Sequence, residues 1–122
     1  MTIIELKRVY EPYDEADGYR VLVDRLWPRG VKKENLKYDL WDKSITPSNE
    51  LRKWVHAQTE DRWTDFAFFY EKELNESGAL KKFADEIRDK QRVTLLYASK
   101  NAAHNHALIL KDMLSRILSD SN

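Results

Sequence analysis

The feature that most constrains this fold is the apolar run from Val21 to Val23, which stands between polar residues. A strand with one face in water alternates apolar and polar residues, whereas this run has no polar position. Such a strand is covered on both faces, as in the parallel sheets of α/β proteins. The segment Val93–Ala98 has the same character. The sequence therefore predicts two central strands, Tyr19–Asp24 and Val93–Ala98, in a mostly parallel sheet.

The spacing of apolar residues elsewhere predicts the remaining elements. Further strands are expected at Thr2–Val9 and, at an edge of the sheet, at Tyr38–Trp41. Four helices are expected: after an N-cap at Ser48, after an N-cap at Thr59, around Leu80, and from a start between Asn101 and Ala103. We therefore expect a single α/β domain over residues 1–122, with a small, mostly parallel sheet of three to four strands flanked by about four helices.

Composition excludes several classes of protein. The 21 basic and 21 acidic residues cancel, which argues against a dedicated nucleic-acid binder, because such domains carry a basic excess. The chain has no cysteine, so it has no disulfide, thiol nucleophile or thiolate metal site. No apolar run approaches the ~20 residues that span a bilayer, and the charged N-terminus has no signal-peptide core. We expect a cytoplasmic protein that does not enter a membrane.

Charged and aromatic residues follow the first central strand. Asp24, Arg25, Trp27 and Arg29 lead into a Pro-Gly turn. In one interpretation the arginines bind a phosphate or carboxylate, while Asp24 orients an arginine or acts on a ligand proton. In the other, an Asp–Arg pair fixes a tight turn and Trp27 covers the core.

A second polar segment follows the strand Val93–Ala98. Ser99 and Asn101 are good capping residues, and Lys100 adds a positive charge. The first turn of the following helix would offer free backbone N–H groups to an anion. This segment therefore predicts an anion site at a helix N-terminus.

Two histidines lie in the same segment. His104 and His106 would be roughly 200° apart on a helix, so they could not bind one metal ion together, and we expect no metal site. One histidine can serve as a general acid or base near neutral pH. The other histidine would pack beside the face of Ala103 and Ala107 with its ring nitrogens satisfied. We assign the proton transfer to His104, with Asp24.

The two segments reinforce each other if their strands are parallel neighbours, because both would then emerge at the same edge of the sheet. We therefore predict one crevice that binds a phosphorylated or carboxylated compound, as an enzyme or as a sensor. The expected ligand-binding residues are Arg25, Trp27, Arg29, Ser99, Lys100, Asn101 and His106. With three glycines, the chain has no phosphate-cradling loop of the P-loop or dinucleotide type, and no cofactor is identified. The alternative is a non-enzymatic module that binds an acidic protein or nucleic acid.

The helix expected after Thr59 has an unusually wide apolar surface. Phe68 and Phe69 extend it beyond the single face that carries Trp63, Phe66 and Tyr70. Such a helix is either buried on two sides or part of a homodimer interface.

Several motifs resemble the YeaO-like proteins, the family catalogued as domain of unknown function 488. The matching motifs are Arg8–Tyr10, Gly18–Gly30, Asp39–Trp41, Pro47-Ser48, Glu50–Trp54, Thr94–Ala98, Lys100 and His104–Ala107. The resemblance implies a compact α/β domain without an established activity.

Two properties of relatives do not transfer to this chain. Some longer relatives carry a cysteine–histidine pattern after the last strand, whereas this chain has Tyr97 and Asn105 there and no cysteine. Other relatives are labelled MarR-type transcription regulators. This sequence shows no winged-helix pattern and no basic recognition helix, so we do not adopt that label.

Overall fold

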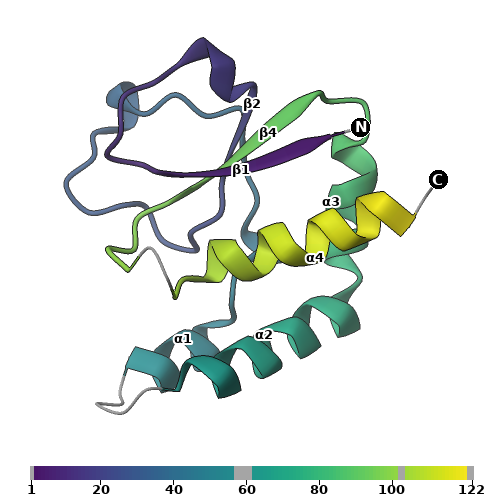
Figure 1. Ribbon diagram of the computed structural model, residues 1–122. Coiled ribbons are helices and arrows are strands. Elements are labelled where there is room, and N and C mark those ends of the chain that lie inside the picture. The colour runs from purple at the N-terminus through teal and green to yellow at the C-terminus, as the bar shows by residue number, and fades with distance from the viewer. Residues whose placement is uncertain (1, 57–61, 102–103, 121–122) are drawn as a thin grey trace.

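Four parallel strands form the sheet of this protein, a computed structural model that describes residues 2–56, 62–101 and 104–120 (Figure 1). The strands are β1 (Ile3–Arg8), β2 (Tyr19–Leu22), β3 (Leu40–Trp41) and β4 (Arg92–Tyr97), in the order β1-β4-β2-β3. Every pairing is parallel. The predicted α/β class, the parallel sheet and the edge strand are therefore confirmed.

The helices are α1 (Asn49–His56), α2 (Trp63–Ser77), α3 (Ala79–Ile87) and α4 (His106–Asp120). They gather on one side of the sheet, and the connections after β1 and β2 cover the other side (Figure 1). Side chains alternate between these faces. Val21 and Leu95 pack with the helices, while Leu22 and Leu96 pack under the loops. Burial on both faces explains why the two central strands lack polar alternation.

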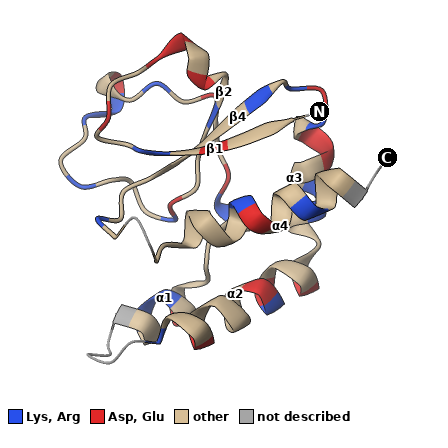
Figure 2. Cartoon of the chain, in the orientation of Figure 1, with Lys and Arg blue, Asp and Glu red and all other residues tan. Residues whose placement is uncertain are grey.

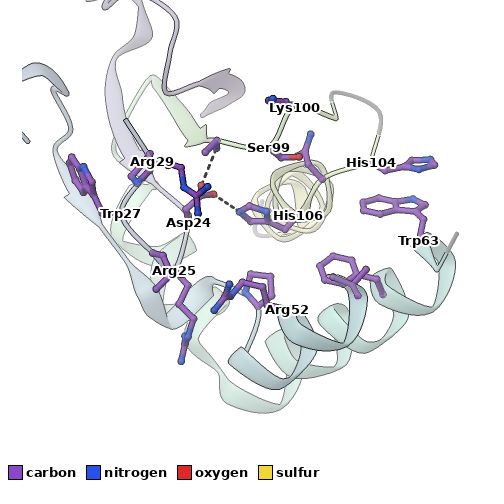
Figure 3. Close-up of a pocket in the computed structure, with 17 residues that line it drawn as sticks. Asp24, Arg25, Trp27, Arg29, Arg52, Trp63, Ser99, Lys100, His104 and His106 are labelled. Carbon is purple, nitrogen blue, oxygen red and sulfur yellow. Dashed lines mark hydrogen bonds and ion pairs between the residues drawn. The ribbon is translucent and has the colours of Figure 1, made fainter. Parts of the chain in front are cut away.

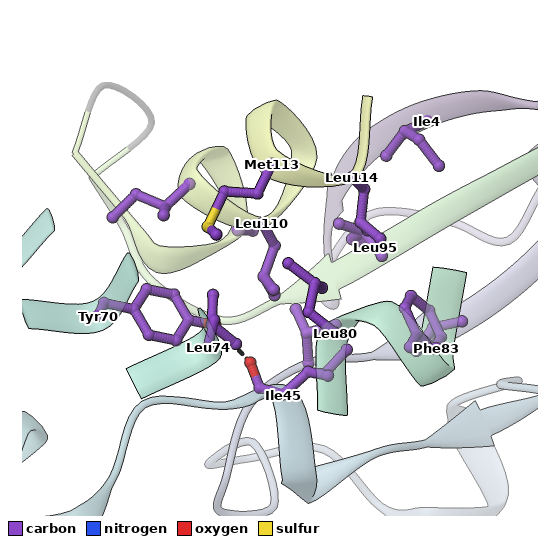
Figure 4. Close-up of a cluster of buried hydrophobic side chains, with 14 of the residues drawn as sticks. Ile4, Ile45, Tyr70, Leu74, Leu80, Phe83, Leu95, Leu110, Met113 and Leu114 are labelled. Atoms are coloured by element: carbon purple, nitrogen blue, oxygen red, sulfur yellow. Dashed lines mark hydrogen bonds between the residues drawn. The ribbon is translucent and has the colours of Figure 1, made fainter. Parts of the chain in front are cut away.

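The larger core lies between α4, the other helices and the sheet (Figure 4). Leu110 and Leu114 of α4 are fully buried there, and burying such a side chain contributes about 1.5–3 kcal/mol. The hydroxyl of the fully buried Tyr70 donates a hydrogen bond to the carbonyl of Ile45. Among the described residues, no helix combines the length and apolar character that crossing a bilayer would require.

The expected helix boundaries are partly correct. Ser48 is the N-cap of α1, because its Oγ accepts a hydrogen bond from the Leu51 amide at 3.1 Å. The predicted start of α4 is wrong: Asn101 is not helical, and the helix begins at His106. Asn105 caps it by accepting from the Leu108 amide at 3.1 Å. The predicted cap at residue 59 and the positions 102–103 lie outside the described residues.

Asp17 joins the connection after β1 to the sheet. It ends the short 3₁₀-helix η1 (Glu15–Asp17) and forms ion pairs with Lys7 and Arg20, while Thr94 Oγ1 donates to its carbonyl at 2.7 Å. Burial acts to raise the pKa of Asp17. Hydrogen bonds from Lys7, the Asp14 backbone and Arg20 outweigh that effect, so the pKa lies below its ordinary value. The connection is thus fixed to β1, β2 and β4.

Candidate functional site

A cleft of about 520 Å³ lies at the carboxyl ends of β2 and β4 (Figure 3). These strands are parallel neighbours, with Leu22 opposite Leu96, so the segments after them start side by side. Open α/β sheets bind ligands at this edge. Eight of the nine expected site residues line the cleft: Asp24, Arg25, Trp27, Arg29, Ser99, Lys100, His104 and His106.

Asp24 connects the two segments. Its Oδ2 accepts a hydrogen bond from the Ala98 amide at 3.0 Å, and its own carbonyl accepts one from the Trp41 indole at 2.7 Å. Its buried Oδ1 lies 3.0 Å from His106 Nε2 (Figure 3), although no N–H points at this oxygen in hydrogen-bonding geometry. The carboxylate is therefore hydrogen-bonded to the segment after β4 through Oδ2, while Oδ1 lies beside His106 without a hydrogen-bond partner among the described residues.

His106, rather than His104, is the histidine that lies against Asp24. Its Nε2 is 2.9 Å from the carbonyl oxygen of Val23. A carbonyl can only accept, so Nε2 must carry the proton. The lone pair of the neutral ring then resides on Nδ1. The carbonyl and the carboxylate together fix the orientation of the ring, as in sites that position a histidine base.

His104 occupies a different part of the cleft. Its ring stacks on Trp63 with centroids 4.8 Å apart and planes inclined by 7° (Figure 3). Its amide donates to Asn101 Oδ1 at 2.9 Å. Among the described residues, the His104 ring forms no hydrogen bond with Asp24. His106, rather than the expected His104, therefore lies beside Asp24. The reason is that α4 begins later than predicted, which places His106 in the first turn of this helix.

Three of the expected cations reach the cleft from its two loops. Arg25 extends toward the start of α1, where Nε donates to Asn49 Oδ1 and Nη1 donates to Thr46 Oγ1, both at 3.2 Å. Arg29 and Lys100 are exposed at the rim. Within the described part of the chain, neither of their side chains forms an ion pair. Arg25 is therefore held in place by protein contacts, whereas Arg29 and Lys100 are free to meet a ligand.

A fourth cation, Arg52 of α1, was missed by the sequence reasoning. Its Nε is buried in the cleft wall and has no hydrogen-bond partner among the described residues, and its Nη2 is 3.5 Å from Asn49 Oδ1. A buried donor without a partner is unusual in folded proteins. The available signal was its place in the Glu50–Trp54 motif. That motif could not show that Arg52 turns toward the loops after β2.

An apolar wall faces the cations. Val55 of α1 and Trp63 and Phe66 of α2 line it, and Trp63 also stacks on Phe66, with centroids 5.8 Å apart. This wall was not predicted as part of the site, because its aromatic residues have the helical spacing typical of a core. The cleft therefore combines a cationic side with an aromatic side.

Trp27 and Asn101 have mainly structural contacts. The Trp27 indole donates to the Val31 carbonyl at 2.6 Å, and its ring packs edge-on against Tyr38 and Trp41. Asn101 shapes the loop before α4 and does not line the cleft. The polar groups of both residues are thus occupied within the protein.

Ser99 lies in a loop that is held from β1. Arg8 donates to the Ser99 carbonyl and to the Ala98 carbonyl, both at 3.0 Å. The Ser99 hydroxyl accepts from the Asn101 amide at 3.2 Å. The backbone of this cleft wall is therefore fixed before any ligand arrives.

The charge of the cleft differs from that of the whole chain. Four cationic side chains and one carboxylate line it, whereas the chain as a whole has no net charge. Basic residues appear in the loops beyond the carboxyl ends of the strands (Figure 2). Among the described residues, no three histidine or carboxylate side chains come close enough together to hold a metal ion. The electrostatics of the cleft therefore favour an anion.

Comparison with known proteins places the chain in a family. Residues 3–122 match the family model DUF488-N3i, described as "Inactive DUF488-N3 subclade". The uncharacterized protein YeaO of Escherichia coli is 51% identical over 111 residues, which cover 91% of this chain and 96% of that protein. The uncharacterized proteins Mb3100c of Mycobacterium bovis and Rv3073c of Mycobacterium tuberculosis are each 40% identical over 114 residues, covering 93% of this chain and 95% of theirs. No solved structure matches the chain significantly. The chain belongs to the DUF488 family, as a YeaO-like member.

Proposed function

We propose that the cleft binds a small molecule that carries a phosphate or carboxylate group. The observation that carries this proposal is the convergence of four cationic side chains on one cleft whose single carboxylate, Asp24, is already engaged by the Ala98 amide and His106. Like charges held together repel one another, and a bound anion removes that repulsion. Arginine is also well suited to phosphate and carboxylate because its guanidinium can donate two parallel hydrogen bonds.

Arg52 and Arg25 are the best candidates for the central contacts. Arg25 uses Nε and one Nη for Asn49 and Thr46, so its other Nη remains available to a ligand. Among the residues that the structure describes, the buried Nε of Arg52 has no hydrogen-bond partner, and an anion in the cleft would supply one. Arg29 and Lys100 at the rim would attract the anion and close around it.

The opposite wall indicates the rest of the ligand. Val55, Trp63 and Phe66 offer an apolar surface, and ligand sites typically pair such a surface with a few polar groups that fix orientation. We therefore expect a compound with an anionic group at one end and an apolar or planar body.

His106 gives the cleft an imidazole ring whose Nδ1 carries a lone pair. The family model is described as inactive, and this description favours binding without turnover. Since the chain has no cysteine, it lacks the disulfides typical of oxidising compartments, and we place this function in the cytoplasm.

The test is a thermal-shift screen with inorganic phosphate, nucleotides, sugar phosphates and keto acids, followed by calorimetry on the compounds that stabilise the protein. Arg52→Gln should weaken binding by about 10- to 100-fold, the effect of losing a charge-assisted hydrogen bond. Lys53→Gln is the matched control, because this neighbouring cation is exposed and does not line the cleft. It should leave the affinity unchanged.

Two outcomes would reject the proposal. One is that every compound leaves the melting temperature unchanged. The other is that Arg52→Gln and Arg25→Ala bind as tightly as the original chain. Strong binding of duplex DNA that falls steeply with salt would instead favour the nucleic-acid module.

A further inference from the structure

One face of α2 is exposed although it carries large apolar side chains. Phe68 and Phe69 are 63% and 44% exposed and contact each other edge-on. Asp65 lies one turn before them and Lys72 one turn after them, and both are exposed. The opposite face of the helix, which includes Tyr70, is in the core. The four exposed residues form what we call the α2 stripe.

We propose that the α2 stripe binds the α2 stripe of a second copy of this chain, with the two helices antiparallel across a two-fold axis. A two-fold axis midway between Phe68 and Phe69 places Phe68 of each copy opposite Phe69 of the other copy. Two-fold interfaces of this kind use the same patch on both subunits, so the patch must complement itself.

The charges of the α2 stripe meet that requirement. Asp65 and Lys72 lie at equal distances, three and a half residues, on either side of the axis, or about 5 Å along the helix. Each Asp65 is therefore opposite Lys72 of the second copy, and the contact occurs twice. Within the described residues neither side chain forms an ion pair, so both remain available for this contact.

The neighbouring surface of α1 would contact the Phe68 ring of the second copy. Trp54 packs edge-on against Phe69, with centroids 5.7 Å apart, and a shallow groove runs beside them between α1 and α2. Phe68 of the second copy would lie against Phe69 at the edge of this groove. Aromatic residues at the centre of a patch with a charged rim are typical of protein interfaces.

This interface leaves the anion cleft open. Trp63 and Phe66, which line the cleft, are not part of the α2 stripe. Dimerisation can therefore be tested independently of ligand binding.

The test is sedimentation equilibrium of the full chain over a range of concentrations, with circular dichroism to confirm folding. We expect a monomer–dimer equilibrium, which Phe68→Glu should weaken more than about 30-fold. Asp65→Lys or Lys72→Asp alone should weaken it about 3- to 10-fold, because like charges would then meet twice. The double variant should restore the original affinity. The control, Glu86→Lys on α3, should have no effect.

The restoration by the double variant separates this geometry from other dimers. A chain that is monomeric at every concentration overturns the proposal. So does a dimer that is insensitive to Phe68→Glu, or one in which the two charge reversals add instead of compensating.

Discussion

Replacing Asp24 by asparagine tests the bridge that joins the ends of β2 and β4. The carboxylate accepts from the Ala98 amide and lies against the protonated Nε2 of His106. An asparagine amide has one oxygen and one NH₂ group. If the oxygen accepts from Ala98, the NH₂ group faces another donor at His106, and the reverse orientation loses the Ala98 contact. Either orientation therefore leaves one contact unmade.

The expected cost follows from these contacts. A hydrogen bond to a charged group contributes about 1.5–3 kcal/mol, and the side chains of Asp24 and His106 are each 16% exposed, so solvent weakens the effect little. We expect the free energy of unfolding to fall by about 2 kcal/mol. For a domain of this size, that loss lowers the melting temperature by roughly 6–12 °C.

The assay is urea unfolding followed by circular dichroism, with Asp24→Asn and His106→Ala measured singly and together. Their coupling energy should be about 1–2 kcal/mol, because the side chains are in direct contact. Asp89→Asn is the matched control, since that carboxylate is 77% exposed. Unfolding of Asp24→Asn and of the control at the same urea concentration would contradict this role of Asp24, and so would additive effects of Asp24→Asn and His106→Ala.

Three further predictions concern residues that support the fold around the cleft. Because the pKa of Asp17 is lowered in the folded state, its carboxylate stabilises the fold fully above the unfolded-state pKa of ~4, and this stabilisation is lost as the pH falls through the folded-state pKa. In urea unfolding, Asp17→Asn should therefore lower the free energy of unfolding more near pH 7 than near pH 2. Gly18→Ala should lower the melting temperature strongly, because its backbone has φ +68° and a Cβ there would lie 2.4 Å from the Arg92 carbonyl oxygen. Gly78→Ala should lower the free energy of unfolding by only ~1 kcal/mol, because a Cβ there, at φ +71°, would enter open space. Tyr70→Phe should lower the free energy of unfolding by about 1–3 kcal/mol, because it leaves a buried carbonyl without its donor; an unchanged value would contradict the contact.

Much of the fold could be predicted because it depends on local patterns. Val21 and Leu22 of β2 and Leu95 and Leu96 of β4 are consecutive apolar residues because both faces of the sheet are covered. Ser48 was recognisable as a cap because it precedes a helical stripe and its hydroxyl reaches the Leu51 amide. The convergence of two loops at one edge follows from the parallel pairing of their strands.

The start of α4 could not be predicted from local patterns. Ser99, Asn101 and Asn105 are all acceptable caps, and contacts distant in sequence decide among them. Arg8 holds the Ser99 carbonyl, and the Asn105 side chain also donates to the Asn101 carbonyl at 2.9 Å. These contacts hold Ser99 and Asn101 outside the helix, and His106 rather than His104 then lies beside Asp24.

Local patterns also could not predict the side-chain orientations of Arg52 and Trp27. Whether Arg52 faces the cleft depends on how α1 rotates against the loop after β2, and no spacing within α1 encodes that. Trp27 turns to the loop-covered face because Tyr38 and Trp41 offer edge-on contacts there. Sequence patterns thus indicate which segments meet, while packing decides which side chains enter the cleft.

The most direct test of the anion cleft is a titration of the ¹⁵N-labelled chain with inorganic phosphate, followed by amide chemical shifts. We expect saturable shifts at the amides of residues 24–27, 29, 52, 98–101 and 104–106, and much smaller shifts in the Arg52→Gln variant. Shifts confined to other basic surfaces, such as Lys81 and Lys82 on α3, or no saturable shift at any phosphate concentration, would contradict the account.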